Sequence, residues 1–102
     1  MNVKQIAGKL RDKLNKYDDF LGLYVYGSRV LGTDNPSSDL DIIAVFKNDL
    51  EYEKQLDISE DIVDISLEIN TVIDFRPMTP EELDANKIYF NEIKKGLYYA
   101  AG

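Results

Sequence analysis

Hydrophobic positions along the chain follow helical and extended periods in turn. Apolar side chains recur at three- and four-residue steps from Val3 to Tyr17, which predicts an amphipathic helix over residues 2–17. Lysine and arginine occupy its other faces, a pattern typical of a packing helix with a solvated basic face. The aromatic and β-branched run from Phe20 to Tyr26 then predicts a strand that ends at a Gly-Ser turn.

A second strand is expected over residues 39–46, after a stretch of turn-forming residues at 32–38. Because side chains alternate along a strand, one face would carry the two carboxylates and the other only apolar groups. The first face comprises Asp39, Asp41, Ile43 and Val45, and the second comprises Leu40, Ile42, Ala44 and Phe46.

Residues 49–68 are rich in aspartate and glutamate, yet isoleucines from Ile58 to Ile69 recur at helical spacing. With Ser59 as the N-cap, this pattern predicts a helix over residues 59–69 after a looser connection. The acidic run is interpreted either as a solvated face or as a docking site. A third strand is expected over residues 71–75, closed by Arg76 and Pro77.

The last part of the chain is predicted to hold two short helices and an extended end. A capping box with proline at the first helical position opens a helix at Thr79. Another helix is expected over residues 86–95, with Gly96 in the C′ position and Tyr89, Phe90 and Ile93 facing inward. The final Leu-Tyr-Tyr-Ala segment is expected to pack on the sheet. The tyrosines are expected mostly in the core or at its rim.

The amino-acid composition excludes several kinds of binding site and catalytic residue. The 102 residues are 44% apolar and 30% charged, which fits one compact domain over residues 1–102. A net charge of −7, from 19 acidic and 12 basic residues, argues against strong binding of duplex nucleic acid. The chain has no cysteine and no histidine, which excludes disulfides, Cys/His zinc sites, cysteine nucleophiles and a histidine base. No apolar run reaches the ~18 residues of a membrane helix, so we expect a cytoplasmic protein without membrane binding.

The densest pattern is Gly27-Ser28, ten residues, then Asp39-x-Asp41. Two carboxylates two residues apart on a strand project from the same face and repel each other unless a cation lies between them. Mg²⁺ prefers carboxylate oxygens together with water and substrate phosphate. Small residues in a turn let backbone N–H groups approach a phosphate. Either half alone is commonly structural, but the combination predicts a site for a metal-bound triphosphate.

This stretch, with Arg29 to Gly32 after the turn and Ser38 before the carboxylates, resembles the minimal nucleotidyltransferases of the DNA polymerase β-like superfamily. The order of elements over nearly the whole chain is similar too. The resemblance implies an α+β fold with a small mixed β-sheet and helices packed mainly on one face. It also implies transfer of a nucleoside monophosphate from an NTP to a hydroxyl acceptor with two Mg²⁺ ions.

Carried over by position, the resemblance implies that Gly27 and Ser28 bind phosphates and that Asp39 and Asp41 hold the metals. The third carboxylate of the family, which assists a metal and acts as base, would be Asp74. The alternative for Asp74 is a solvent-facing residue before the turn at residues 76–77, and Glu68 is a more distant candidate. Arg29 either reaches a phosphate or only braces the loop at residues 37–39.

The resemblance favours an adenylyltransferase that uses ATP. The short chain has little left to bind an acceptor, so the acceptor is expected on a partner protein. MntA-type antitoxins of this family are paired with a helical HEPN-type toxin, which they silence by adenylylating a tyrosine. The alternatives are a non-catalytic module that neutralises its partner by contact and, less favoured, an antibiotic nucleotidyltransferase. A homo-oligomer is compatible with each of these hypotheses.

Overall fold

The computed structural model describes residues 3–26 and 40–102. In the described residues the predicted α+β class is confirmed, with helices and strands mixed along the chain. The elements in order are α1 (Val3–Leu14), β1 (Phe20–Tyr26), β2 (Leu40–Phe46), α2 (Tyr52–Ile69), β3 (Ile73–Met78), α3 (Pro80–Ala85), α4 (Lys87–Ile93) and β4 (Leu97–Ala100).

The strands form one sheet in the order β3-β2-β1-β4. β1 is antiparallel to both of its neighbours, β2 and β4, whereas β2 and β3 are parallel. Parallel neighbours need a crossover connection, and α2 provides it between β2 and β3. The sheet is therefore mixed, as predicted, and its parallel pair lies at one edge.

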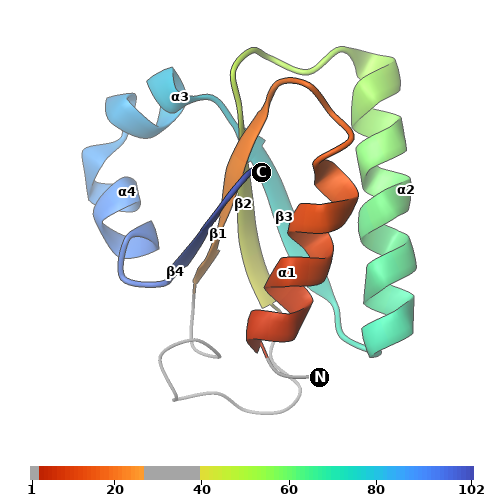
Figure 1. The fold of residues 1–102 in the computed structure, drawn as a ribbon. Helices are drawn as coiled ribbons and strands as arrows, with labels where there is room; N and C mark the ends of the chain where they lie inside the picture. The colour runs from red at the N-terminus through yellow and green to blue at the C-terminus, as the bar shows by residue number, and fades with distance from the viewer. Residues whose placement is uncertain (1–2, 27–39) are drawn as a thin grey trace.

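Helices cover the sheet unequally. Figure 1 shows the long helices α1 and α2 on one side of the sheet and the short helices α3 and α4 on the other. The larger core lies between the long helices and the strands, and a smaller one joins Ile43 and Val45 of β2 to Leu83 of α3 and Ile93 of α4. Every residue of β2 after Asp41 is buried, because this strand has helices over both of its faces.

Charged contacts join α1 to α2. Lys13 Nζ lies 3.6 Å from an oxygen of Asp64, Lys16 Nζ lies 2.8 Å from one of Asp61, and Lys9 pairs with Glu68. The basic face of α1 therefore contacts the acidic helix instead of facing only solvent. Within the part of the chain that the structure describes, no helix is long and apolar enough to cross a membrane.

The helix expected over residues 59–69 begins earlier, so its predicted start was wrong. α2 extends from Tyr52 to Ile69, with Glu51 as its N-cap and Ser59 inside it. Acidic residues near the start of a helix interact favourably with its dipole, so the acidic connection is itself helical. The helix ends at Asn70, whose φ of 53° is left-handed.

The predicted bounds of the third strand, residues 71–75, were wrong as well, since β3 begins at Ile73. β3 does not close at residues 76–77 but continues through Arg76 and Pro77 to Met78. Among the described strands, β3 lies at the edge of the sheet and pairs with β2 alone, and an edge strand tolerates proline because one of its sides needs no ladder hydrogen bonds. This extension places three more residues beside β2.

The capping box was predicted correctly. Thr79 Oγ1 accepts a hydrogen bond from the Glu82 amide at 3.2 Å, and the Thr79 amide donates to Glu82 Oε1 at 3.0 Å. α4 ends at Ile93, with Lys94 as its C-cap, so Gly96 does not hold the predicted C′ position. Gly96 instead passes close to the backbone of β1. The last segment forms β4, as expected from its extended pattern.

Candidate active site

Two of the predicted carboxylates lie side by side at one edge of the sheet. Asp41 and Asp74 are each the second residue of their strand, and the parallel register of β2 and β3 places them directly opposite each other. Opposed residues on neighbouring strands project from the same face, and the strands are about 4.8 Å apart. Asp74 is therefore not an isolated residue before a turn. It is exposed, whereas Asp41 is half-buried.

The other predicted site residues, Gly27, Ser28, Arg29 and Asp39, lie outside the described residues. The described residues that border them are Tyr26, the last residue of β1, and Leu40, the first of β2. Tyr26 is opposite Asp41 in the antiparallel register of β1 and β2. Asp41 thus lies between Tyr26 on one neighbouring strand and Asp74 on the other.

A tyrosine pair adjoins the carboxylates on this face. The hydroxyl groups of Tyr26 in β1 and Tyr89 in α4 are 2.8 Å apart, and their rings meet edge-on with centroids separated by 6.3 Å. Burial raises the pKa of Tyr26 above its usual range, and the Tyr89 hydrogen bond and the charge of Asp41 raise this pKa further. The Arg76 guanidinium opposes this rise in the pKa of Tyr26. Tyr26 is therefore a neutral phenol within electrostatic reach of the Asp41 carboxylate and the Arg76 guanidinium.

Arg76 lies two residues after Asp74 in β3, so both side chains project from the same face. A cavity of about 460 Å³ adjoins it, a size within the range of small-molecule sites. The cavity separates β3 from the two short helices, and its lining comprises Arg76, Pro77, Met78, Glu82, Asn86 and Tyr89. The Arg76 guanidinium matches the geometry of phosphate oxygens, while Glu82 places one carboxylate in the same lining.

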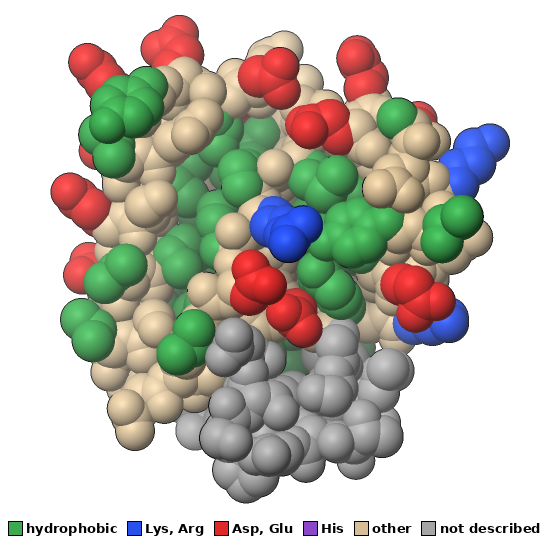
Figure 2. All heavy atoms as spheres, turned by 180° about the vertical axis from the view of Figure 1, so that it is seen from behind, with side chains coloured by type: hydrophobic (Ala, Val, Ile, Leu, Met, Phe, Trp, Pro, Cys, Tyr) green, Lys and Arg blue, Asp and Glu red, His purple; other side chains and the backbone are tan. Residues whose placement is uncertain are grey.

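Figure 2 shows the β3 edge of the sheet from behind. One basic side chain stands in the middle of this view, next to a group of hydrophobic side chains and above a pair of acidic ones. The sequence pattern did not single out Arg76 and Tyr89 as neighbours of the predicted site. The two-residue spacing of Asp74 and Arg76 was a usable signal, but the strand was expected to end at Phe75, one residue before Arg76.

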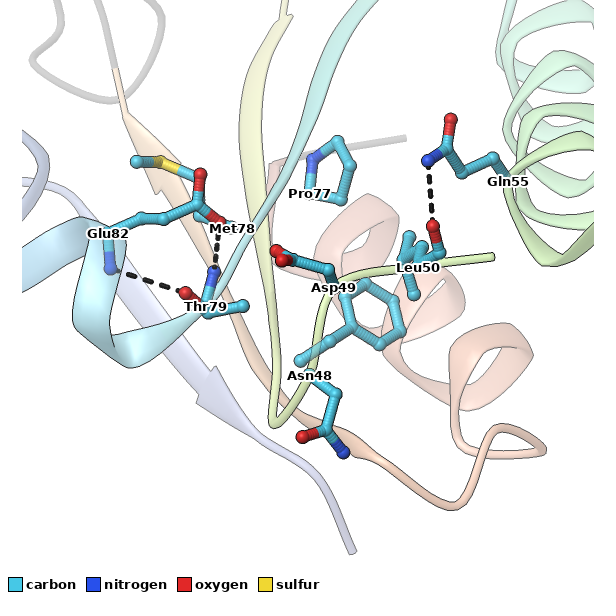
Figure 3. A pocket seen from close by; sticks show the side chains of 9 residues that line it. Asn48, Asp49, Leu50, Gln55, Pro77, Met78, Thr79 and Glu82 are labelled. Atoms are coloured by element: carbon cyan, nitrogen blue, oxygen red, sulfur yellow. Dashed lines mark hydrogen bonds between the residues drawn. The ribbon is translucent and has the colours of Figure 1, made fainter. Parts of the chain in front are cut away.

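Another cavity, of about 220 Å³, opens at the opposite end of β2 and β3. Figure 3 shows the Asp49 side chain pointing into it, while Glu82 and Thr79 are bound to each other in the capping box. Its residues include Phe46, five positions along β2 from Asp41, or about 17 Å. This cavity is therefore separate from the paired carboxylates.

The donor set can be compared with the needs of a divalent ion. Among residues 3–26 and 40–102, no three Asp, Glu, His or Cys side chains are grouped closely enough to hold a metal. The predicted set of three also includes Asp39, which lies outside these residues. Asp41 and Asp74 supply carboxylate oxygens, the ligands that Mg²⁺ prefers, so the two fit as part of such a set.

Comparison with known proteins identifies the family. The sequence profile described as "Polymerase beta, Nucleotidyltransferase" matches residues 8–96. The chain belongs to this nucleotidyltransferase family. Asp41 and Asp74 are both inside the matched range, as are the Gly-Ser pair and Asp39. No curated protein sequence matches the chain.

Solved structures share the fold of this family member. A toxin–antitoxin complex with AMP-PNP is 17% identical, with a TM-score of 0.62 over 98% of this chain and 72% of that one. The toxin–antitoxin MntA-HpeT, in a variant with two aspartates replaced by glutamate, is 16% identical, with a TM-score of 0.63 over 96% and 72%. A candidate nucleotidyltransferase from Sulfolobus solfataricus is 19% identical, with a TM-score of 0.59 over 93% and 77%.

Proposed function

We propose that the protein is a Mg²⁺-dependent adenylyltransferase that moves AMP from ATP to a hydroxyl group on a partner protein. The register that sets Asp41 beside Asp74 is the observation that carries this proposal. It brings a carboxylate of the Asp-x-Asp motif next to a second one from a strand 33 positions later in the chain. Because the chain belongs to a nucleotidyltransferase family, we interpret the two carboxylates as ligands of the metal ions used in nucleotidyl transfer.

Asp39 and Asp41 would hold the metal ions with Asp74, and Gly27, Ser28 and Arg29 would bind the phosphates. Bound Mg²⁺ neutralises phosphate charge in the transition state. Asp74 accepts the proton of the acceptor hydroxyl, whose oxygen forms a bond to the α-phosphorus. The bond from that phosphorus to the bridging oxygen breaks, and pyrophosphate leaves with the bond's electron pair. The exposure of Asp74 suits a base that must meet an acceptor from outside.

The cavity beside Arg76 adds a place for the rest of the nucleotide. Arg76 would donate to phosphate oxygens, and Tyr89 offers an aromatic edge at the cavity wall. Tyr26 holds Tyr89 in place through the hydrogen bond between their hydroxyl groups. These three side chains come from β1, β3 and α4, so the site would depend on the contact of α4 with the sheet.

The acceptor is proposed to be a tyrosine of a helical HEPN-type toxin, which would make this protein an antitoxin. Two of the structural neighbours are toxin–antitoxin complexes, and one of them is described with the nucleotide analogue AMP-PNP. Those properties belong to the neighbours, and their transfer to this protein rests on the shared fold. The product of the adjacent gene is the first acceptor to test.

The decisive experiment incubates the protein with that gene product, ATP and Mg²⁺ and measures the intact mass of both proteins. We expect the partner to gain one or more AMP units. Asp41→Asn and Asp74→Asn should each slow this transfer at least about 100-fold, whereas Asp84→Asn, at an exposed aspartate of α3, should not. Full labelling by the Asp39→Ala, Asp41→Ala double variant would contradict the metal-site assignment.

The second hypothesis is a non-catalytic module that neutralises its partner by contact. The exposed acidic surface of α2 is the observation in its favour. This hypothesis predicts no mass increase and full neutralisation of the partner by the double variant. The same mass measurement, combined with a growth assay of the co-expressed pair, therefore separates the two functions.

A further inference from the structure

The outer face of α2 carries a row of apolar side chains that nothing in the described chain covers. Tyr52, Leu56, Val63 and Leu67 recur at helical spacing and are 74%, 47%, 54% and 75% exposed. The face of α2 that packs on the sheet is formed by different residues, including Ile58, Ile62 and Ile65. These four exposed residues are called the α2 stripe below. An amphipathic helix does not need a second apolar face for folding.

Acidic residues border the α2 stripe on one side. Glu53, Asp57 and Glu60, here called the acidic flank, are exposed and form no ion pair with any other described residue. The lysines of α1 pair with acids closer to α1, namely Asp61, Asp64 and Glu68. The acidic flank thus keeps its negative charge next to exposed apolar surface.

The α2 stripe is also hollowed. Leu56 and Val63 form a shallow groove of about 390 Å³ with Ser59, Glu60 and Asp64. Apolar walls with carboxylates at the rim match a segment that has apolar side chains along its centre and basic side chains along its edge. Figure 2 shows hydrophobic and acidic side chains alternating along this side of the molecule.

The surface leads to the paired carboxylates. α2 ends at Ile69, and the chain passes through Val72, which is 63% exposed, directly into β3. The Val72 carbonyl accepts a hydrogen bond of 2.9 Å from the amide of Leu40, the residue before Asp41. Figure 1 shows this end of α2 and the first residues of β2 and β3 at the same end of the molecule. A protein seated on α2 would therefore reach the Asp41–Asp74 edge.

We infer that the α2 stripe and the acidic flank are the docking surface for the partner protein, which contributes an amphipathic segment edged with lysine or arginine. Charge complementarity selects this occupant. A second copy of the chain is disfavoured because two acidic flanks would face each other across an antiparallel helix pair. The identity of the partner rests on the proposed function, whereas the chemistry of the surface does not.

The test is a titration of the adjacent-gene product into the protein by isothermal titration calorimetry. Leu56→Gln combined with Val63→Gln should raise the Kd at least about tenfold, because glutamine keeps the helix and removes the apolar contact. Ile88→Gln is the matched control, since Ile88 is 83% exposed on α4, away from α2. Glu60→Lys should also weaken binding, and Glu81→Lys on α3 is its control.

Wild-type affinity in the α2 double variant, loss of binding in the Ile88→Gln control, or no complex with the wild-type protein would each overturn the inference. Transfer is measured on the same samples by intact mass. If only the α2 variants lose binding and the wild-type protein transfers no AMP, the docking surface is supported and the proposed activity is rejected. If the wild-type protein transfers AMP and the α2 variants do so with an unchanged KM for the partner, the proposed activity is supported and the docking surface is rejected.

Discussion

Gly96 illustrates how a single residue is fixed by a neighbouring strand. A Cβ added at Gly96 would collide with the carbonyl oxygen of Val25 and come within 2.9 Å of the Tyr26 Cα. Those atoms belong to the β1 backbone and cannot move aside without shifting the strand that carries Tyr26. Gly96→Ala should therefore lower the free energy of unfolding by about 1–3 kcal/mol or more, measured by urea denaturation.

Gly8 provides the matched control for that substitution. It lies inside α1, and an added Cβ would meet no atom within 4 Å. Because alanine has the higher helix propensity, Gly8→Ala should raise the free energy of unfolding by about 0.5–1 kcal/mol. An equal effect of the two substitutions would contradict the described contact between residue 96 and β1.

Tyr17 should make the free energy of unfolding depend on pH in the alkaline range. Burial and a 2.9 Å hydrogen bond to Asp61 raise the pKa of Tyr17 from 10.0 to about 12. Below pH 10 the phenol is protonated in the folded and unfolded states, so its contribution to stability is complete. Between pH 10 and 12 the unfolded state loses the proton first, and the free energy of unfolding should fall. Denaturation curves at pH 8 and pH 11 measure this loss.

Tyr17→Phe should reduce the loss of stability between pH 8 and pH 11. Burial also raises the pKa values of Tyr24 and Tyr26, so part of the loss should remain in this variant. Tyr52→Phe, at an exposed position of α2, serves as the control. If Tyr17→Phe loses as much stability as the wild type over this range, the assignment to Tyr17 is wrong.

At the level of single residues, the Asp-x-Asp motif and its face of β2 could be predicted from the sequence, but the neighbours of Asp41 on other strands could not. Alternation along β2 correctly placed Asp41 with Ile43 and Val45 on one face. The position of Asp74 beside Asp41 depends on a parallel pairing between strands that α2 separates in sequence. The residues around Asp74 do not indicate that register. The sequence alone therefore left Asp74 either as the third site carboxylate or as a solvent-facing residue before a turn.

At the element scale, the cap of α3 is a strong local signal. α3 has only six residues, so a large part of its stability should come from the capping box of Thr79 and Glu82. Thr79→Ala should cost about 1 kcal/mol of unfolding free energy in chemical denaturation. A cost below the error of the measurement would show that the cap does not hold this helix.

Ser59 tests the observed start of α2. As an N-cap, it would cost about 1 kcal/mol when replaced by alanine. Since Ser59 lies exposed within α2, Ser59→Ala should instead leave the unfolding free energy unchanged or raise it by a few tenths of a kcal/mol. A clear loss of stability would favour the shorter helix over residues 59–69.

The two misjudged elements share one physical cause. The acidic residues in 49–58 interact favourably with the dipole of a helix start but repel one another, and a proline at position 77 lacks the amide hydrogen of a strand ladder, so the local signal for each element was mixed. Tertiary contacts change both outcomes: Lys54 in the first turns of α2 pairs with Asp19 at 2.5 Å, and Pro77 lies on an edge strand paired with Ala44. Elements with strong local signals, such as α1, β1 and the α3 cap, could be predicted because they need no distant partner.

At the scale of the whole molecule, the sheet separates two surfaces with different proposed tasks. The face of the sheet that carries Asp41, Asp74 and Arg76 adjoins the short helices and the larger cavity there. The outer face of α2, beyond the main core, carries the apolar and acidic surface. The α+β class and the family were predictable because the order of elements and the Gly-Ser/Asp-x-Asp pattern are local. The meeting of both surfaces at one end of the molecule required the topology.

Calorimetric binding of ATP to the isolated protein, with and without Mg²⁺, tests the proposed site most directly. ATP should bind in the presence of Mg²⁺ and at least about tenfold more weakly in excess EDTA. Asp41→Asn should remove this Mg²⁺ dependence, whereas Asp84→Asn should retain it. Equal ATP affinity with and without Mg²⁺, or an unchanged Mg²⁺ dependence in Asp41→Asn, would contradict the claim that these carboxylates form a metal-dependent nucleotide site.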